Sequence, residues 1–106
     1  MHLATIAVNG RSAAAVRLDD GSLLEIAPAA TAVPGEAGEA LRGGTLQSVI
    51  DGGAAALEAL RSLHAAFEAG EHADARHAST DIALLAPLPA PRKNVFCVGR
   101  NYAEHI

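Results

Sequence analysis

The side chains best suited to chemistry lie together at the end of the chain: Gly99, Arg100, Asn101, Tyr102, Glu104 and His105. An imidazole such as that of His105 can act as a general base near neutral pH. Such a base needs an orienting carboxylate, and Glu104 does not serve, because adjacent residues on a helix do not face each other. The useful carboxylate would follow His105 by three or four residues. On its own, the segment also fits an ordinary surface histidine.

The elements expected around these residues are a short apolar strand over about 94–98 and then the first turn of a helix. Gly99 allows the backbone to turn sharply where the strand ends, and polar groups just past a strand end are a common place for a site. Arg100 has two open interpretations, as a contact to a substrate carboxylate or as a cap of the corner. Cys97 lies within the apolar strand, so we expect it to pack as a small hydrophobe and not to act as a nucleophile.

The stretch LLAPLPAPRKNVFCVGRNYAEHI, residues 84–106, resembles the start of the catalytic domain in the fumarylacetoacetate hydrolase family. In that family a proline-containing approach leads to a strand and then to the pattern V-G-x-N-Y-x-x-H. The pattern positions are held here by Val98, Gly99, Asn101, Tyr102 and His105. The preceding 80 residues resemble, more loosely, the small N-terminal domain that many bacterial members carry.

The resemblance implies an enzyme that acts on small 2-oxo acids or 1,3-dicarbonyl compounds. A divalent ion, Mg²⁺ or Mn²⁺, chelates the substrate oxygens and stabilises the enolate that develops as a C–C bond breaks. His105 matches the histidine of a His–Glu dyad that activates water. Arg100, Asn101 and Tyr102 take substrate-binding positions, and Gly99 is structural.

Two parts of that machinery are absent from this sequence. The dyad glutamate is expected three residues after the histidine, and the metal ligands of the family are an E-x-E pair and a later aspartate, whereas no E-x-E occurs here. The first hypothesis is therefore an N-terminal fragment of a metal-dependent hydrolase, or of a related decarboxylase or isomerase. We expect the fragment to be inactive alone, to hold no cofactor or metal itself, and to self-associate through its uncovered tail. The alternative is a complete, non-enzymatic interaction module.

The turn signals along the chain predict an α+β fold. Asn9-Gly10 and Asp19–Gly21 predict a three-stranded antiparallel meander over about 2–8, 13–18 and 23–27, with Pro28 as its end. Residues 29–44 are predicted to be a loop, and Thr45 is expected to cap a short helix over 46–51.

A longer helix is predicted over 54–70, because Leu57, Leu60, His64 and Phe67 fall on one face. A strand is expected within 81–89. The predicted organisation is a small domain at 1–86, a proline-containing linker at 87–93, and at 94–106 the opening strand of a mostly-β catalytic domain that is missing.

Composition and charge limit the classes of protein to which this chain could belong. The chain has 106 residues and a net charge of −4, and its eight Lys and Arg residues form no basic stripe, which excludes a nucleic-acid partner. No apolar run approaches the ~20 residues of a membrane span, and the N-terminus lacks the layout of a signal peptide, so we expect a cytoplasmic protein. Twenty-five alanines and few aromatic residues predict a thin core of Leu, Val and Ile.

Two further groups of titratable residues are expected to be structural. His64 lies on the apolar face of the long helix and is predicted to pack at the core or its boundary. His72, Asp74 and His77 form H-x-D-x-x-H, but this spacing fits no standard zinc pattern, so a solvated loop is the prediction.

Overall fold

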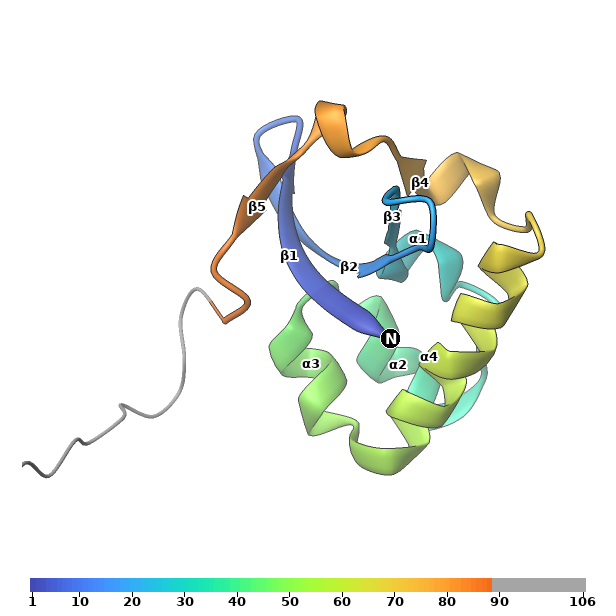
Figure 1. Cartoon of the computed structure of the whole chain (residues 1–106). Coiled ribbons are helices and arrows are strands. Elements are labelled where there is room, and N and C mark those ends of the chain that lie inside the picture. The colour runs from blue at the N-terminus through green and yellow to red at the C-terminus, as the bar shows by residue number, and fades with distance from the viewer. Residues whose placement is uncertain (89–106) are drawn as a thin grey trace, which may run out of the picture.

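The computed structural model describes residues 1–88, which form a five-stranded antiparallel sheet and several helices. The strands are β1 (His2–Val8), β2 (Arg11–Arg17), β3 (Leu23–Glu25), β4 (Arg76–His77) and β5 (Ala83–Leu85). Their order in the sheet is β4-β3-β2-β1-β5. The two last strands of the sequence therefore take the two edges of the sheet, on either side of the N-terminal meander (Figure 1).

The predicted meander is confirmed, with shifted bounds. Asn9 and Gly10 both have positive φ, 49° and 79°, as a two-residue hairpin turn requires, and this turn sets the register Val8↔Arg11 through His2↔Arg17. The second strand begins two residues earlier than expected, and the third ends at Glu25. The expectation that Pro28 ends the meander is wrong, because the chain already turns into a helix at Ile26.

Four helices follow the meander: α1 (Ile26–Ala29), α2 (Gly35–Arg42), α3 (Leu46–Asp51) and α4 (Gly53–Glu68). The two predicted helices are present, and the Thr45 hydroxyl accepts the Ser48 N–H at 3.0 Å, as expected of an N-cap. The predicted loop at 29–44 is wrong, since it contains α2. Along α4, the fully buried residues are Ala56, Leu60, Leu63 and Phe67, while Leu57 and His64 are only partly buried.

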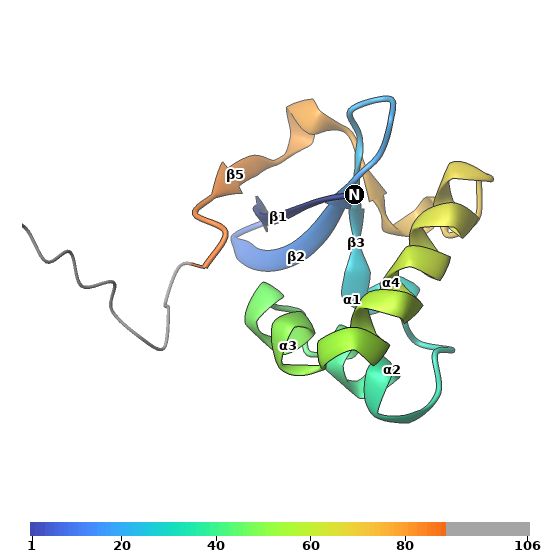
Figure 2. The same cartoon turned by 60° about the horizontal axis from the view of Figure 1, so that its bottom comes forward.

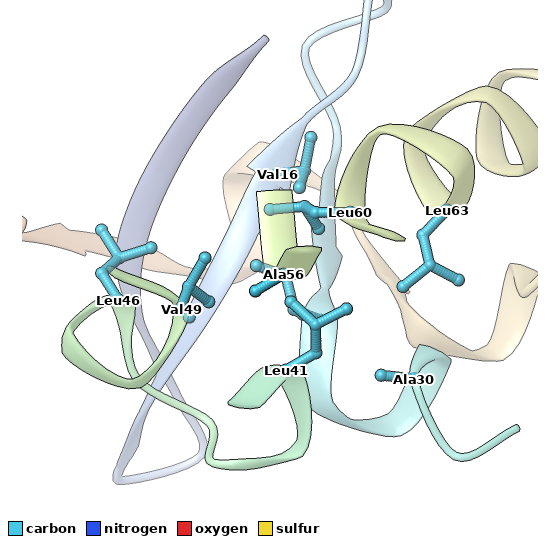
Figure 3. Close-up of a cluster of buried hydrophobic side chains, with 10 residues drawn as sticks. Val16, Ala30, Leu41, Leu46, Val49, Ala56, Leu60 and Leu63 are labelled. Atoms are coloured by element: carbon cyan, nitrogen blue, oxygen red, sulfur yellow. The ribbon is translucent and has the colours of Figure 1, made fainter. Parts of the chain in front are cut away.

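The helices cover one face of the sheet, called here the helix face (Figures 1 and 2). Val16 and Ala14 of β2 point into this face and pack with side chains of all four helices, which form the larger core (Figure 3). Its members are mostly aliphatic: Ala14, Val16, Ile26, Ala30, Leu41, Leu46, Val49, Ala56, Leu60 and Leu63. Leu, Val and Ile residues are buried in the core of residues 1–88 as predicted, but alanines and Phe67 are buried with them.

The opposite face of the sheet is crossed by residues 76–85, which we call the arm. The arm runs from β4 at one edge to β5 at the other, through a short 3-10 turn at Ser79–Asp81 (Figures 1 and 2). Ile82 of the arm packs against a second cluster on this arm face: Ile6, Val8, Ala13, Ala15 and Leu23. The segment from His72 to His77, predicted as a solvated loop, contains the 3-10 turn Ala73–Ala75 and β4.

Helices long and apolar enough to cross a membrane do not occur among residues 1–88.

Candidate functional site

The residues that the sequence singles out for chemistry lie outside the described part of the chain: Gly99, Arg100, Asn101, Tyr102 and His105. The predicted strand at 94–98 with Cys97 and most of the predicted linker lie there too. Within residues 1–88, two features are relevant to function: the segment that precedes residues 89–106, and a cluster of charged side chains on the sheet.

The segment that leads toward residues 89–106 is tied to the first strand. β5 pairs antiparallel with β1, with Leu85 opposite Thr5. The buried Thr5 hydroxyl then donates a hydrogen bond to the Pro87 carbonyl at 2.6 Å. Thr5 lies on the helix face of the sheet, because its partner Ala14 packs in the larger core. This hydrogen bond therefore holds Pro87 at the sheet edge on the same face. The buried Thr5 hydroxyl thus ties Pro87 to β1.

An apolar surface surrounds this exit. A pocket of about 240 Å³ lies between Thr5, the start of α3 at Leu46, and Pro87 with Leu88. Beside it, Leu85 and Leu88 are 40% and 36% exposed, while the adjacent Leu84 lies on the opposite face of the sheet and is 70% exposed. Leucines so exposed on an edge strand are typical of a surface that packs against another element or chain. The exit therefore carries an exposed apolar surface.

The charged cluster of the domain is formed by Arg11, Glu25 and His77. Glu25 Oε2 accepts from Arg11 Nη1 at 2.7 Å and Oε1 from Nη2 at 2.8 Å, which is a bidentate pair. His77 Nε2 lies 3.0 Å from Glu25 Oε1. The Glu25 side chain is 9% exposed, whereas that of Arg11 is 53% exposed. The cluster joins β2, β3 and β4, and so fixes the start of the arm to the sheet.

Electrostatics in the cluster favour a structural role. The hydrogen bonds from Arg11 hold the pKa of the Glu25 carboxyl below its ordinary value of 4.5, against the opposing effect of burial, and His77 adds to the lowering. Both carboxylate oxygens are occupied by protein donors. A carboxylate that stays ionised and fully paired is a poor general base, and this arrangement serves as a brace between strands.

His77 makes a tertiary contact that the sequence did not reveal. The prediction of a solvated loop is wrong for this residue, which belongs to β4 and contacts Glu25, 52 residues earlier. His72 packs edge-on against the Phe67 ring with a centroid distance of 5.6 Å, and only Asp74 of the motif is exposed. No local pattern links His77 to Glu25, because their contact depends on β3–β4 pairing.

Comparison of the chain with protein-family models, with curated proteins and with solved structures gave no match.

His64 has the boundary position expected of it. Its side chain is 24% exposed, and Nε2 lies 3.4 Å from Glu68 Oε1, one turn further along α4. Glu68 Oε1 also accepts the Asp19 N–H at 3.0 Å, which links α4 to the β2–β3 turn. His64 thus contacts the carboxylate that links α4 to the β2–β3 turn.

Replacing Glu25 with glutamine is expected to lower the free energy of unfolding by about 1–2 kcal/mol at pH 7, because charge-assisted hydrogen bonds to a half-exposed arginine are lost. The lowered pKa of the Glu25 carboxyl determines how its contribution to the free energy of unfolding depends on pH. The stabilisation is complete above the unfolded pKa of about 4.5 and is lost as the pH falls through the lower folded value. Urea unfolding between neutral and acidic pH should therefore show a shallower acid loss in the variant than in the wild type.

Glu58→Gln is the matched control, since Glu58 is exposed on α4. It should leave the difference between neutral and acidic stability nearly unchanged. Equal acid profiles for Glu25→Gln and the wild type would show that the cluster does not contribute to folding.

Proposed function

We propose that this chain is the N-terminal part of a fumarylacetoacetate hydrolase-like enzyme that cleaves C–C bonds in small 2-oxo acids or 1,3-dicarbonyl compounds. The observation that carries the proposal is the V-G-x-N-Y-x-x-H pattern at 98–105, with His105 as the general base. Arg100, Asn101 and Tyr102 are proposed to contact the substrate, and Gly99 to allow the turn that presents them.

The architecture of residues 1–88 supports the proposal of an accessory domain that precedes the catalytic domain. The α+β unit has its own aliphatic core, and its last strand, β5, precedes the pattern in the sequence. The exposed leucines at the exit give a following domain an apolar surface to pack on. In this proposal the unit is an accessory domain at 1–86, joined through 87–93 to the catalytic domain that opens at 94.

The proposed metal ion needs ligands from elsewhere. Residues 1–88 contain no group of three or more His, Cys, Asp or Glu side chains arranged to hold a metal ion. When bound, such an ion would supply Lewis-acid stabilisation of the developing enolate. The contribution assigned to this chain is limited to orienting the substrate and taking a proton from water at His105.

The test compares two proteins in one assay of C–C hydrolysis: the 106-residue chain and a longer protein that begins with these residues. We expect turnover only from the longer protein, abolished by a chelator and restored by Mg²⁺ or Mn²⁺, since metal catalysis contributes several kcal/mol to such reactions. Turnover by the 106-residue chain, or metal-independent turnover by the longer protein, would overturn the proposal.

The alternative proposal is a stand-alone interaction module. It is favoured by the exposed apolar surface at Leu85 and Leu88. In that case the 106-residue chain should be the form present in cells, and Leu85→Glu should abolish its self-association or its capture of a partner.

A further inference from the structure

A second pocket lies on the arm face of the sheet, opposite to the face on which Thr5 contacts Pro87. Its volume is about 630 Å³, within the range of about 300–1,000 Å³ found for small-molecule sites. The sheet contributes Ala4 and Leu23, and the arm contributes Ile82 and Leu84 as an apolar wall. We call this space the arm pocket; it is an open, mostly apolar recess in which the arm forms one side.

Two basic side chains stand at the rim of the arm pocket. His2 and Arg17 are directly opposite each other on β1 and β2, and both line the pocket. Within residues 1–88, the Arg17 guanidinium has no carboxylate oxygen within 4.0 Å and no hydrogen-bond partner. The nearby Asp20 is engaged by Ser22 and lies 3.7 Å from Arg76.

Asp19 lines an adjoining recess with His2 and Arg17 but makes no ion pair with Arg17, so the guanidinium is left without a direct counter-charge among residues 1–88. An opposite-charge pair across two strands stabilises a sheet, whereas two basic groups facing each other do not. An anion placed between Arg17 and His2 would receive charge-assisted hydrogen bonds from the guanidinium and a donor from the imidazole. Arginine is the side chain whose geometry best matches a carboxylate, because it donates two parallel N–H groups.

We propose that the arm pocket binds a small molecule with an apolar body and a single carboxylate. The carboxylate contacts Arg17 and His2, and the body lies against Ala4, Leu23, Ile82 and Leu84. The proposal does not depend on the function proposed above, because every residue in it belongs to residues 1–88. It adds a ligand site on the accessory domain, distinct from the pattern at 98–105.

The probe is sodium hexanoate, added to the ¹⁵N-labelled 106-residue chain at constant ionic strength. Saturable amide shifts are expected at Ala4, Leu23 and Ser79, which line the pocket. Hexanol and hexylammonium should bind at least about tenfold more weakly, because they lack the charge that Arg17 pairs with. Arg17→Gln should weaken hexanoate binding by about tenfold or more.

Two controls keep the result interpretable. Arg61→Gln removes an exposed arginine on α4 that does not line the pocket, and it should bind hexanoate as the wild type does. Leu84→Glu places a carboxylate in the pocket wall at a position that is 70% exposed, so the fold should persist while binding is lost. Shifts that never saturate, equal binding of hexanol, or an unchanged affinity in Arg17→Gln would each overturn the proposal.

Discussion

Replacing His105 with alanine in the longer protein should lower kcat by about 10²–10⁴-fold and leave KM close to its original value. The reason is the division of roles in the proposed reaction. The substrate is held mainly through contacts that this substitution leaves intact, whereas the proton of the attacking water loses its acceptor. A fall in kcat without a matching rise in KM is the signature of a group that acts in the transition state.

The control for this result is His64→Ala. His64 packs on α4 beside Glu68, so its loss should change the stability of the accessory domain and leave kcat near that of the wild type. The assay belongs on a substrate whose C–C cleavage consumes water, because a decarboxylation needs little help from a base. Full turnover of such a substrate by His105→Ala would remove His105 from the mechanism.

Replacing Phe67 with alanine should lower the free energy of unfolding by about 3–5 kcal/mol, a large part of the ~5–15 kcal/mol that holds a domain of this size together. Phe67 is the only Phe, Tyr or Trp within residues 1–88, and it is 1% exposed. On α4, it packs with two leucines and two alanines, Leu18, Leu24, Ala29 and Ala75. Close-packed surroundings relax only partly into the cavity that the truncation leaves.

Urea unfolding of the 106-residue chain measures this effect. Leu84→Ala is the matched aliphatic truncation at an exposed position and should change the free energy of unfolding by no more than about 0.5 kcal/mol. Similar losses in the two variants would show that Phe67 is not the centre of a packed cluster.

Local signals predicted the parts of the fold that depend on neighbouring residues. Asn9-Gly10 forms its hairpin because both positions adopt positive φ at low cost. Thr45 caps α3 because its hydroxyl reaches the N–H three residues later. The long α4 was readable because its apolar residues recur with helical spacing.

Tertiary contacts decided the elements that the sequence did not reveal. Pro28 suggested a break, but it stands in the first turn of α1, where no N–H is needed. A loop was predicted over 29–44, yet α2 forms there, and the missing side chain of Gly38 lets this helix approach the Val33 carbonyl more closely than a Cβ would allow. Arg42 then donates to the carbonyls of Ala30 and Val33, which fixes α2 against the preceding segment.

The pattern at 98–105 and the sites within residues 1–88 likewise differ in how far the sequence alone could predict them. The pattern at 98–105 is local, so the sequence alone is enough to recognise it. The charged cluster and the arm pocket depend on β3–β4 and β1–β5 pairing between residues far apart in the chain. Neither Glu25 with His77 nor Arg17 with Leu84 could be brought together before the strand order was known.

The most direct test of the proposed origin is the DNA sequence that follows the codon for Ile106. If the chain is the opening of a fumarylacetoacetate hydrolase-like enzyme, the reading frame continues with a glutamate three residues after His105, one turn along the same helix face. An E-x-E pair and a later aspartate should follow downstream, as ligands for the divalent ion. A stop codon directly after Ile106, or a continuing frame that lacks both the glutamate and the E-x-E pair, would contradict the proposal.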